Sequence, residues 1–141
     1  MAEPDVIAAL VAALAGDAAT TALVGDAIFG GELPEGIAAE MPKRAIVVAA
    51  SGGPEFTGRG SAEVDAQRID LFGYGATPEE ANRVRSTAAR RLWSIERETH
   101  AGTLVHWVNR AGGFSQARDR DGQWPQSFQS FQVFYSLQEV Q

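Results

Sequence analysis

The stretch SFQSFQVFYSLQ, from Ser127 to Gln138, decides the fold because its apolar and polar side chains alternate over a long run. Apolar residues stand at every second position from Phe131 to Leu137, and mainly polar residues stand between them. Side chains of an extended chain point to opposite faces in turn, so this alternation is typical of a β-strand with one buried face. The stretch therefore predicts the last strand of a sheet.

The second face of this predicted strand carries aromatic side chains among polar ones. Phe128 and Phe134 share it with serine and glutamine residues, and Trp124 lies just before the strand. A mixed aromatic and polar face favours a contact surface with another protein. The simpler interpretation, in which these aromatic residues belong to the core, stays open. We take Trp124, Phe128 and Phe134 as candidate residues of a subunit or partner interface.

Three further stretches are predicted to be strands, over residues 44–51, 62–74 and 103–110. The first is apolar almost throughout, which is typical of a strand covered on both faces. In the second, Ile69 and Leu71 share the only evenly apolar face. The glycine-rich segment 52–61 between the first two predicts a hairpin-like loop, and the polar segment 111–123 predicts another loop.

Two helices are predicted around these strands. Pro4 and Asp5 open the first, which is rich in alanine and leucine and ends near Gly16; a short helical turn over residues 18–23 follows it. Thr77-Pro78-Glu79-Glu80 has the pattern of a capping box with proline at the first helical position. The second helix is expected to run from there to about Glu98. Its apolar stripe, which should face the sheet, consists of Ala81, Val84, Ala88, Leu92 and Ile95.

The order of these elements predicts an α+β fold. We expect an antiparallel sheet of about four strands with two helices packed on one face. The 141 residues, of which 45% are hydrophobic, suit a single domain over residues 1–141. The remaining extended piece, residues 27–34, is expected to be a loop or a minor strand.

Composition excludes several classes of protein. The chain has no cysteine, which excludes disulfides, thiolate metal sites and a cysteine nucleophile. Its net charge of −6 disfavours a broad nucleic-acid interface. The N-terminal segment is acidic, unlike a secretory signal, and its apolar run is shorter than the ~20 residues that cross a bilayer. We expect a soluble protein with no membrane contact.

No motif predicts catalytic, cofactor-binding or metal-binding residues. The two histidines, His100 and His106, have no companion ligands at metal-site spacing. The segment 119–122 has two aspartates, but Arg118 and Arg120 interleave with them and would oppose a bound cation. The glycines of segment 52–60 precede a strand, whereas phosphate-binding loops precede a helix. The sequence therefore favours a protein that is not an enzyme.

Five arginines gather on the segment that holds the second helix: Arg83, Arg85, Arg90, Arg91 and Arg97. The simpler interpretation is a solvated helix face with ion pairs to nearby glutamates, each contributing little to stability. The alternative is a docking surface for an acidic partner or a neighbouring subunit.

Several segments resemble the tail-terminator (tail-completion) family, which joins the tail tube to the head connector in long-tailed phages of the siphophage type. Ala22–Phe29 (ALVGDAIF), followed by Leu33-Pro34, resembles the family's stretch of the type ALVGDRIY that leads to a Leu-Pro turn. Gln67–Tyr74 (QRIDLFGY) and Gln132–Tyr135 (QVFY) resemble two of its strands. The likeness extends over nearly the whole chain; segment 110–123 is the one that the family pattern does not match.

The resemblance implies a structural protein of the virion tail or neck, made in the host cytoplasm. Such a protein forms a hexameric ring at the head-proximal end of the tail tube, ends tail growth and joins the tail to the head. Its partners would be further copies of itself, the tail tube protein and a head-side connector or stopper protein, with the genome DNA passing through the lumen without specific binding. Phe56, Arg59, Arg118 and Arg120, from the two loops, complete the candidate interface. The alternatives are another neck component, namely a head-completion or stopper protein, and a small enzyme that uses His100 or His106.

Overall fold

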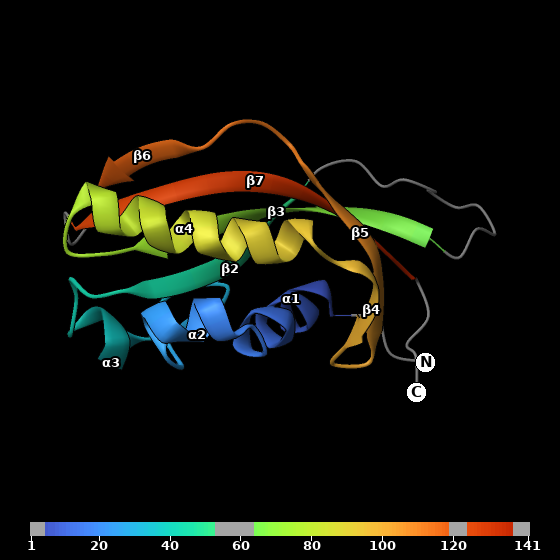
Figure 1. Cartoon of the computed structure of the whole chain (residues 1–141), viewed down its shortest axis with the longest axis horizontal. Helices are drawn as coiled ribbons and strands as arrows, with labels where there is room; N and C mark the ends of the chain where they lie inside the picture. The colour runs from blue at the N-terminus through green and yellow to red at the C-terminus, as the bar shows by residue number, and fades with distance from the viewer. Residues whose placement is uncertain (1–4, 53–63, 119–123, 137–141) are drawn as a thin grey trace.

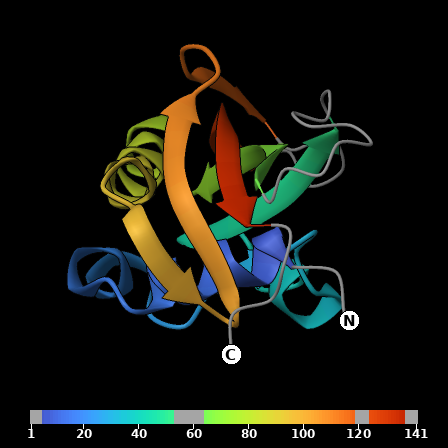
Figure 2. The same cartoon turned by 90° about the vertical axis from the view of Figure 1, so that its right-hand side faces the viewer.

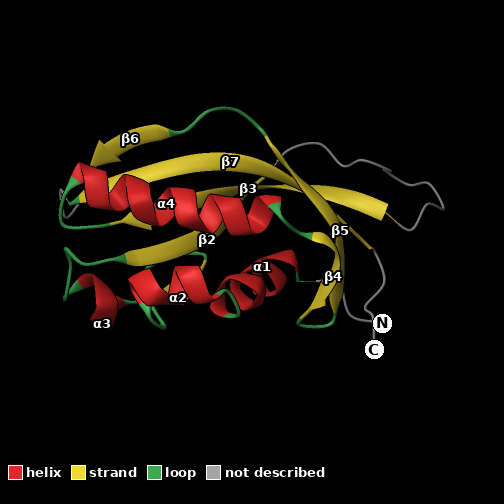
Figure 3. Cartoon of the chain, viewed as in Figure 1, coloured by secondary structure: helices red, strands yellow, loops and turns green. Residues whose placement is uncertain are grey.

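A curled, seven-stranded mixed sheet wraps around the helices of the chain (Figures 1 and 2). The computed structural model describes residues 5–52, 64–118 and 124–136. The strands are β1 (Ile28–Gly30), β2 (Ala45–Gly52), β3 (Val64–Tyr74), β4 (Glu96–His100), β5 (Thr103–Arg110), β6 (Ser115–Arg118) and β7 (Pro125–Ser136). The helices are α1 (Val6–Ala15), α2 (Ala18–Val24), α3 (Glu35–Ala38) and α4 (Pro78–Trp93) (Figure 3).

Strand β7 lies at the centre of the sheet and has the alternation that the sequence predicts. It pairs with β3 along one edge, and its other edge is shared between β6 and β5. Odd-numbered residues of β7 are buried and even-numbered residues are half-buried. Phe131 has no exposed surface and lies in the core, whereas Phe128 and Phe134 lie on the opposite face.

The predicted fold class is wrong. The sheet has seven strands in the order β1-β2-β3-β7-β5-β4, with β6 paired to β7, and it is mixed because β1 runs parallel to β2. Four helices accompany it in the described residues, in place of the two expected. The sequence predicts neither β4 nor β6, which have five and four residues and are largely exposed. Short exposed strands carry no period-two pattern, so nothing in their residues marks them as strands. Strand β1 has three residues and lies in segment 27–34, for which the sequence predicts a loop or a minor strand.

Helix α4 begins as predicted but ends earlier. The Thr77 side chain accepts a hydrogen bond from the Glu80 amide at 3.1 Å, and the Glu80 carboxylate accepts one from the Ala76 amide at 3.3 Å. The predicted stripe is buried against the sheet. The helix ends at Trp93, not near Glu98, because Ser94 caps it and the chain then turns into edge strand β4. A polar edge strand has the same charged composition as an exposed helix end, which explains the error.

The α1–α2 segment fills the concave side of the sheet beside α4. The side chain of Asp5 caps α1, and that of Asp17 caps α2. Leu10 and Leu14 of α1 have no exposed surface, because α1 contacts α4 and strands β1, β2, β4 and β5. Helix α4 packs on β3 and β7 and runs along them in Figure 1.

Gly73 of β3 sets the distance between α4 and the sheet. A Cβ atom at this position would lie 2.6 Å from the amide nitrogen of Arg85 and 2.8 Å from the carbonyl oxygen of Ala81. Both atoms belong to the α4 backbone, so no side-chain rotation could relieve the clash. The close approach brings Arg85 down onto the sheet, where the groove described below forms.

Candidate functional site

A groove runs between the outer side of α4 and the connection from β5 to β6. Helix α4 contributes Arg85, Ala89 and Trp93, which lie one turn apart on one face of the helix. The end of β5 contributes Arg110, and the connection contributes Phe114. The groove has a volume of about 420 Å³, and no carboxylate is among the described residues that line it.

Arg85 forms the floor of this groove and is only 6% exposed. Its Nε donates to the Ser127 hydroxyl at 3.1 Å, its Nη1 to Gln129 Oε1 at 2.8 Å and its Nη2 to Asn82 Oδ1 at 3.0 Å. All three acceptors are neutral. None of the ion pairs among the described residues involves Arg85, so its charge is buried without a carboxylate beside it.

Ser127 and Gln129 explain why the first part of β7 carries polar residues on its core face. Both are buried beneath Arg85. Gln129 also donates from Nε2 to the carbonyl oxygen of Gly112 at 3.1 Å, which ties the β5–β6 connection to the floor of the groove. The polar pair therefore holds the guanidinium and the groove wall in fixed positions.

Two aromatic rings stand over the two arginines of the groove. The guanidinium carbon of Arg85 lies 4.4 Å from the centre of the Phe114 ring, and that of Arg110 lies 4.8 Å from the centre of the Trp93 ring. Trp93 and Phe114 are each 51% exposed, so both rings present apolar surface to solvent at the groove. Burial lowers the pKa of Arg85 below its ordinary value, and the like charge of Arg110 lowers it further.

The predicted interface residues on β7 lie on the open face of the sheet, away from the helices. The rings of Phe128 and Phe72 are 5.7 Å apart, and the ring of Phe134 stacks on Trp107 at 4.8 Å. Trp107 is 45% exposed. Between the two aromatic pairs, the Ser130 hydroxyl donates to Asp70 at 2.5 Å. The structure thus gathers Phe128 and Phe134 into one face of aromatic and polar side chains.

The other predicted interface residues are placed less closely together. Arg118 lies on exposed strand β6, at the end that pairs with Pro125. Trp124 is half-buried, and its Nε1 atom finds no acceptor among the described residues. Phe56, Arg59 and Arg120 lie outside the described residues.

Two other arginines of α4, Arg90 and Arg91, form ion pairs with acidic side chains, as expected for a solvated helix face. Arg91 binds both carboxylate oxygens of Glu98, at 2.7 and 3.1 Å, and also donates to the carbonyl oxygen of Ala13 at 3.3 Å. The hydrogen bonds from Arg91 lower the pKa of Glu98 to about 2, against the opposing effect of burial. Arg90 pairs with Asp17 at 3.3 Å. The sequence does not predict that Arg85 is buried, because its spacing on the helix does not differ from that of a surface arginine.

The two histidines lie on neighbouring strands and take part in different contacts. Nε2 of His100 lies 2.8 Å from Glu98, and the ring of His106 lies 6.1 Å from the ring of Trp107. Within residues 5–52, 64–118 and 124–136, no three His, Asp or Glu side chains are grouped as metal ligands. In the same part of the chain, no single helix is long and apolar enough to cross a membrane; α1 and α2 reach that length only as a pair bent by 86°.

Comparison with known proteins identifies a similar fold. No protein-family model matches the chain. No curated protein matches it in sequence. Among solved structures, a chain of "Virion of native gene transfer agent (GTA) particle" superposes with a TM-score of 0.62 over 92% of both chains, at 16% sequence identity. At this identity the match shows a shared fold.

Proposed function

We propose that the chain is a structural protein of a phage-like virion, and that it forms a ring at the head-proximal end of the tail tube. In this role it ends tail growth and joins the tail to the head connector. The observation that carries the proposal is the shared fold: the similar chain belongs to a virion, and the match covers 92% of each chain with a TM-score of 0.62. A match of this extent, in which neither chain has a large unmatched part, favours a role of the same kind.

The segments that resemble the tail-terminator family support the finer role. The ALVGDAIF segment spans the end of α2 and the start of β1, and the QRIDLFGY and QVFY segments lie in the neighbouring central strands β3 and β7. They therefore occupy connected parts of one fold, as segments of a common domain over residues 1–141 would. A head-completion or stopper protein remains the alternative within the neck.

The proposed contacts with other subunits lie on the open face of the sheet and on the loops beside it. Phe128 and Phe134 are half-buried there, and exposed Trp107 extends the same aromatic surface. Apolar area of this kind gains free energy when a partner covers it. Arg118 and Trp124, together with Phe56, Arg59 and Arg120, are proposed to contribute at the rim.

The charge of the chain fits the passage of DNA through a ring. With a net charge of −6, few phosphate contacts are available, and long-range repulsion opposes retention of the duplex. We propose that the DNA passes the lumen without specific binding and that the ring has no catalytic role.

A tube-growth assay tests the proposed function. Tail tube protein encoded beside this chain is allowed to polymerise, and the purified chain is added at increasing ratios. Ring formation at tube ends predicts that mean tube length falls and that the added chain is recovered at one end of each tube. Growth that continues unchanged, with no chain bound to tubes, refutes the proposal.

A binding assay with an isolated head-side connector, in place of the tube, distinguishes a tail terminator from a head-completion or stopper protein. A head-completion or stopper protein should bind the connector and leave tube growth unaffected. A tail terminator should stop tube growth without the connector being present.

A further inference from the structure

The groove beside α4 holds two positive charges that the described part of the chain does not neutralise. Arg85 is buried at its floor with neutral partners only, and Arg110 stands at its wall over Trp93. None of the ion pairs in the described residues involves either arginine. A buried charge without a counter-ion costs folding free energy, so the burial of Arg85 at 6% exposure calls for a role.

The shape of the groove favours a single side chain as its occupant. The rings of Phe114 and Trp93 stand over the two guanidinium groups and are each half-exposed, so a group that binds in the groove lies against aromatic surface. Gln129 fixes both Arg85 and the wall at Gly112, so the site is held in place before anything binds. A carboxylate suits this combination because guanidinium groups bind carboxylates with directed hydrogen bonds.

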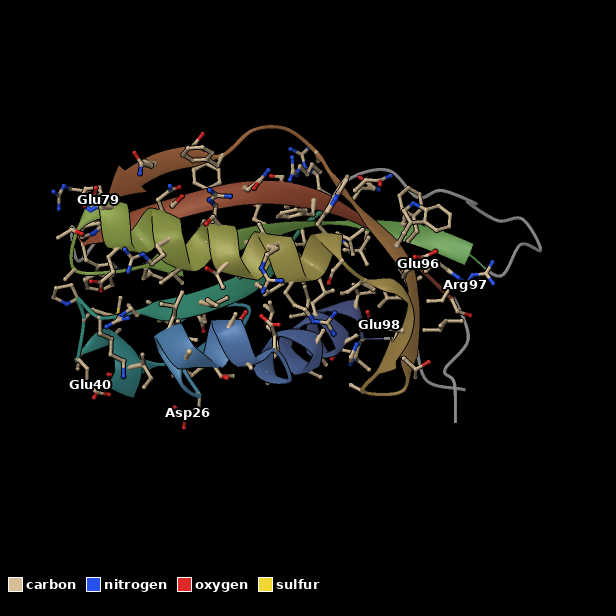
Figure 4. The ribbon with its side chains drawn as sticks, viewed as in Figure 1. Asp26, Glu40, Glu79, Glu96, Arg97 and Glu98 are labelled. Carbon is tan, nitrogen blue, oxygen red and sulfur yellow. The ribbon has the colours of Figure 1, made fainter. Side chains whose placement is uncertain are left out.

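The chain itself carries an acidic end on the side of the molecule away from the groove. We use the name acidic end for the exposed residues Asp26, Glu32, Glu35 and Glu40, around α3 and the turn before β1. In Figure 4, Asp26 and Glu40 point outward below α2 and α3, whereas α4 and β6 lie above them. Figures 1 and 2 both place α3 at the bottom and β6 at the top. Among the described residues, only Glu40 of this set has an ion pair, with Lys43 at 3.8 Å.

We propose that the groove between Trp93 and Phe114 receives a carboxylate from the acidic end of a second copy of this chain. Opposite charges on opposite ends of one molecule allow each copy to bind the next head to tail. Such a contact is heterologous, and it closes into a ring when the rotation per copy allows. The inference rests on the proposed function in that it names the contact by which a ring subunit would hold its neighbour.

Duplex DNA is a poorer occupant of the same groove. Phosphates recur along a duplex every few ångströms and need a continuous basic surface, whereas Arg85 lies beneath an aromatic ring at the bottom of a short groove. The net charge of −6 also repels a polyanion while leaving an excess of carboxylates for contacts between copies.

Disulfide cross-linking tests the contact directly, because the chain has no cysteine of its own. Gly113 lies in the groove wall and Gly36 lies in the acidic end, and a Cβ atom at either position would meet no other atom within 4 Å. An equimolar mixture of Gly113→Cys and Gly36→Cys proteins is oxidised, and disulfide-linked dimers are quantified over time. We expect mixed dimers to form about tenfold faster than dimers of either variant alone, since docking raises the local concentration of the two thiols.

Charge variants identify what drives the cross-link. Arg110→Glu in the Gly113→Cys chain should slow it about fivefold or more, and so should 0.5 M salt, since both weaken an attraction between charges. Glu35→Lys in the Gly36→Cys chain should also slow it, and the two reversals together should restore it. Arg83→Glu, exposed on the same helix but outside the groove, is the matched control and should have little effect. A positional control replaces Gly36→Cys with Thr99→Cys, which is exposed on β4 outside the acidic end and should not cross-link faster with Gly113→Cys.

Three results would overturn the inference: equal rates for mixed and single variants, a cross-link that ignores the charge of residue 110, or protection of the Gly113→Cys thiol from alkylation by short duplex DNA. Circular dichroism of each variant confirms that it is folded. The outcome is separable from that of the tube-growth assay. If the chain stops tube growth but does not form this cross-link, the proposed function stands and the contact is refuted. If the cross-link forms but tube growth is unaffected, the contact stands and the proposed function is refuted.

Discussion

Single side chains hold the helices to the sheet at a few points, and the Arg91–Glu98 pair is the most closely bonded of these. Arg91 comes from α4 and Glu98 from edge strand β4, and Arg91 also reaches the carbonyl oxygen of Ala13 in α1. One guanidinium therefore joins three elements. The pair is only partly buried, so solvent reduces its contribution to stability.

Stability should depend on pH through Glu98. Its pKa is lowered from 4.5 to about 2 in the folded chain, so the carboxylate stabilises the fold above pH 4.5 and this contribution is lost as the pH falls towards 2. We expect Glu98→Gln to lower the free energy of unfolding by about 1 kcal/mol near pH 7 and by almost nothing near pH 2. Urea unfolding at both pH values measures the difference. Glu96→Gln, on the same strand and exposed, is the matched control variant.

Arg85 should tolerate no replacement of its guanidinium. Arg85→Lys keeps the charge but cannot make the three hydrogen bonds to Ser127, Gln129 and Asn82 together. We expect the free energy of unfolding to fall by about 2 kcal/mol, because buried acceptors lose their donors. The exposed control Arg83→Lys should change it by less than about 0.5 kcal/mol. Equal effects of the two variants would mean that Arg85 has no structural role.

At the scale of elements, the position of α4 depends on the absence of a side chain in β3. Gly73→Ala would place a methyl group against the α4 backbone at Arg85 and Ala81. We expect the helix to be displaced, with a loss of about 3 kcal/mol and a melting temperature lower by about 10 °C. Gly36→Ala has open space and should change the melting temperature by less than about 2 °C. Differential scanning calorimetry compares the two variants.

The two faces of β7 should respond differently to the loss of an aromatic ring. Phe131 is fully buried, so Phe131→Ala should cost about 4 kcal/mol through the cavity it leaves. Phe134 stacks on Trp107 on the open face, so Phe134→Ala should cost about 1 kcal/mol. Chemical unfolding of both variants checks the ratio. Comparable losses would place Phe134 in the core and remove it from the proposed interface.

The elements also show which parts of the fold the sequence could predict. Strands β3, β5 and β7 and helix α4 carry a period of side chains because each buries one face against the rest of the molecule. Strand β2 carries an apolar run because its first half is buried on both faces. The sequence predicts all five elements. Strands β4 and β6 are held by backbone pairing to longer neighbours, which leaves no pattern in their own residues. Strand β1 is held in the same way, and the sequence predicts it only as a loop or a minor strand. The seven-stranded sheet followed from those pairings, so its extent and its parallel β1–β2 pair could not be predicted.

One of the two candidate sites could be predicted from the sequence and the other could not. The alternation in β7 placed Phe128 and Phe134 on the second face correctly, while their role in an interface stays a prediction. The groove could not be predicted, because it needs Arg85 of α4 to meet Ser127 and Gln129, more than forty residues away. The one available signal was the polar pair itself, which breaks the apolar pattern on the core face of β7.

At the scale of the whole molecule, the curled sheet leaves an aromatic face, a basic groove and an acidic end on different sides. A subunit that contacts neighbours on two sides and a tube or connector on a third needs separate surfaces of this kind. In the proposed ring, the net charge of −6 would disfavour retention of DNA in the lumen. These surfaces together are consistent with the proposed ring subunit.

Electron microscopy of the purified chain, alone and mixed with tail tubes, tests the central claim most directly. The account predicts ring-shaped particles in solution, or tubes that carry one ring at one end when the ring forms only on its partner. Single molecules in solution together with bare ends on every tube would contradict it.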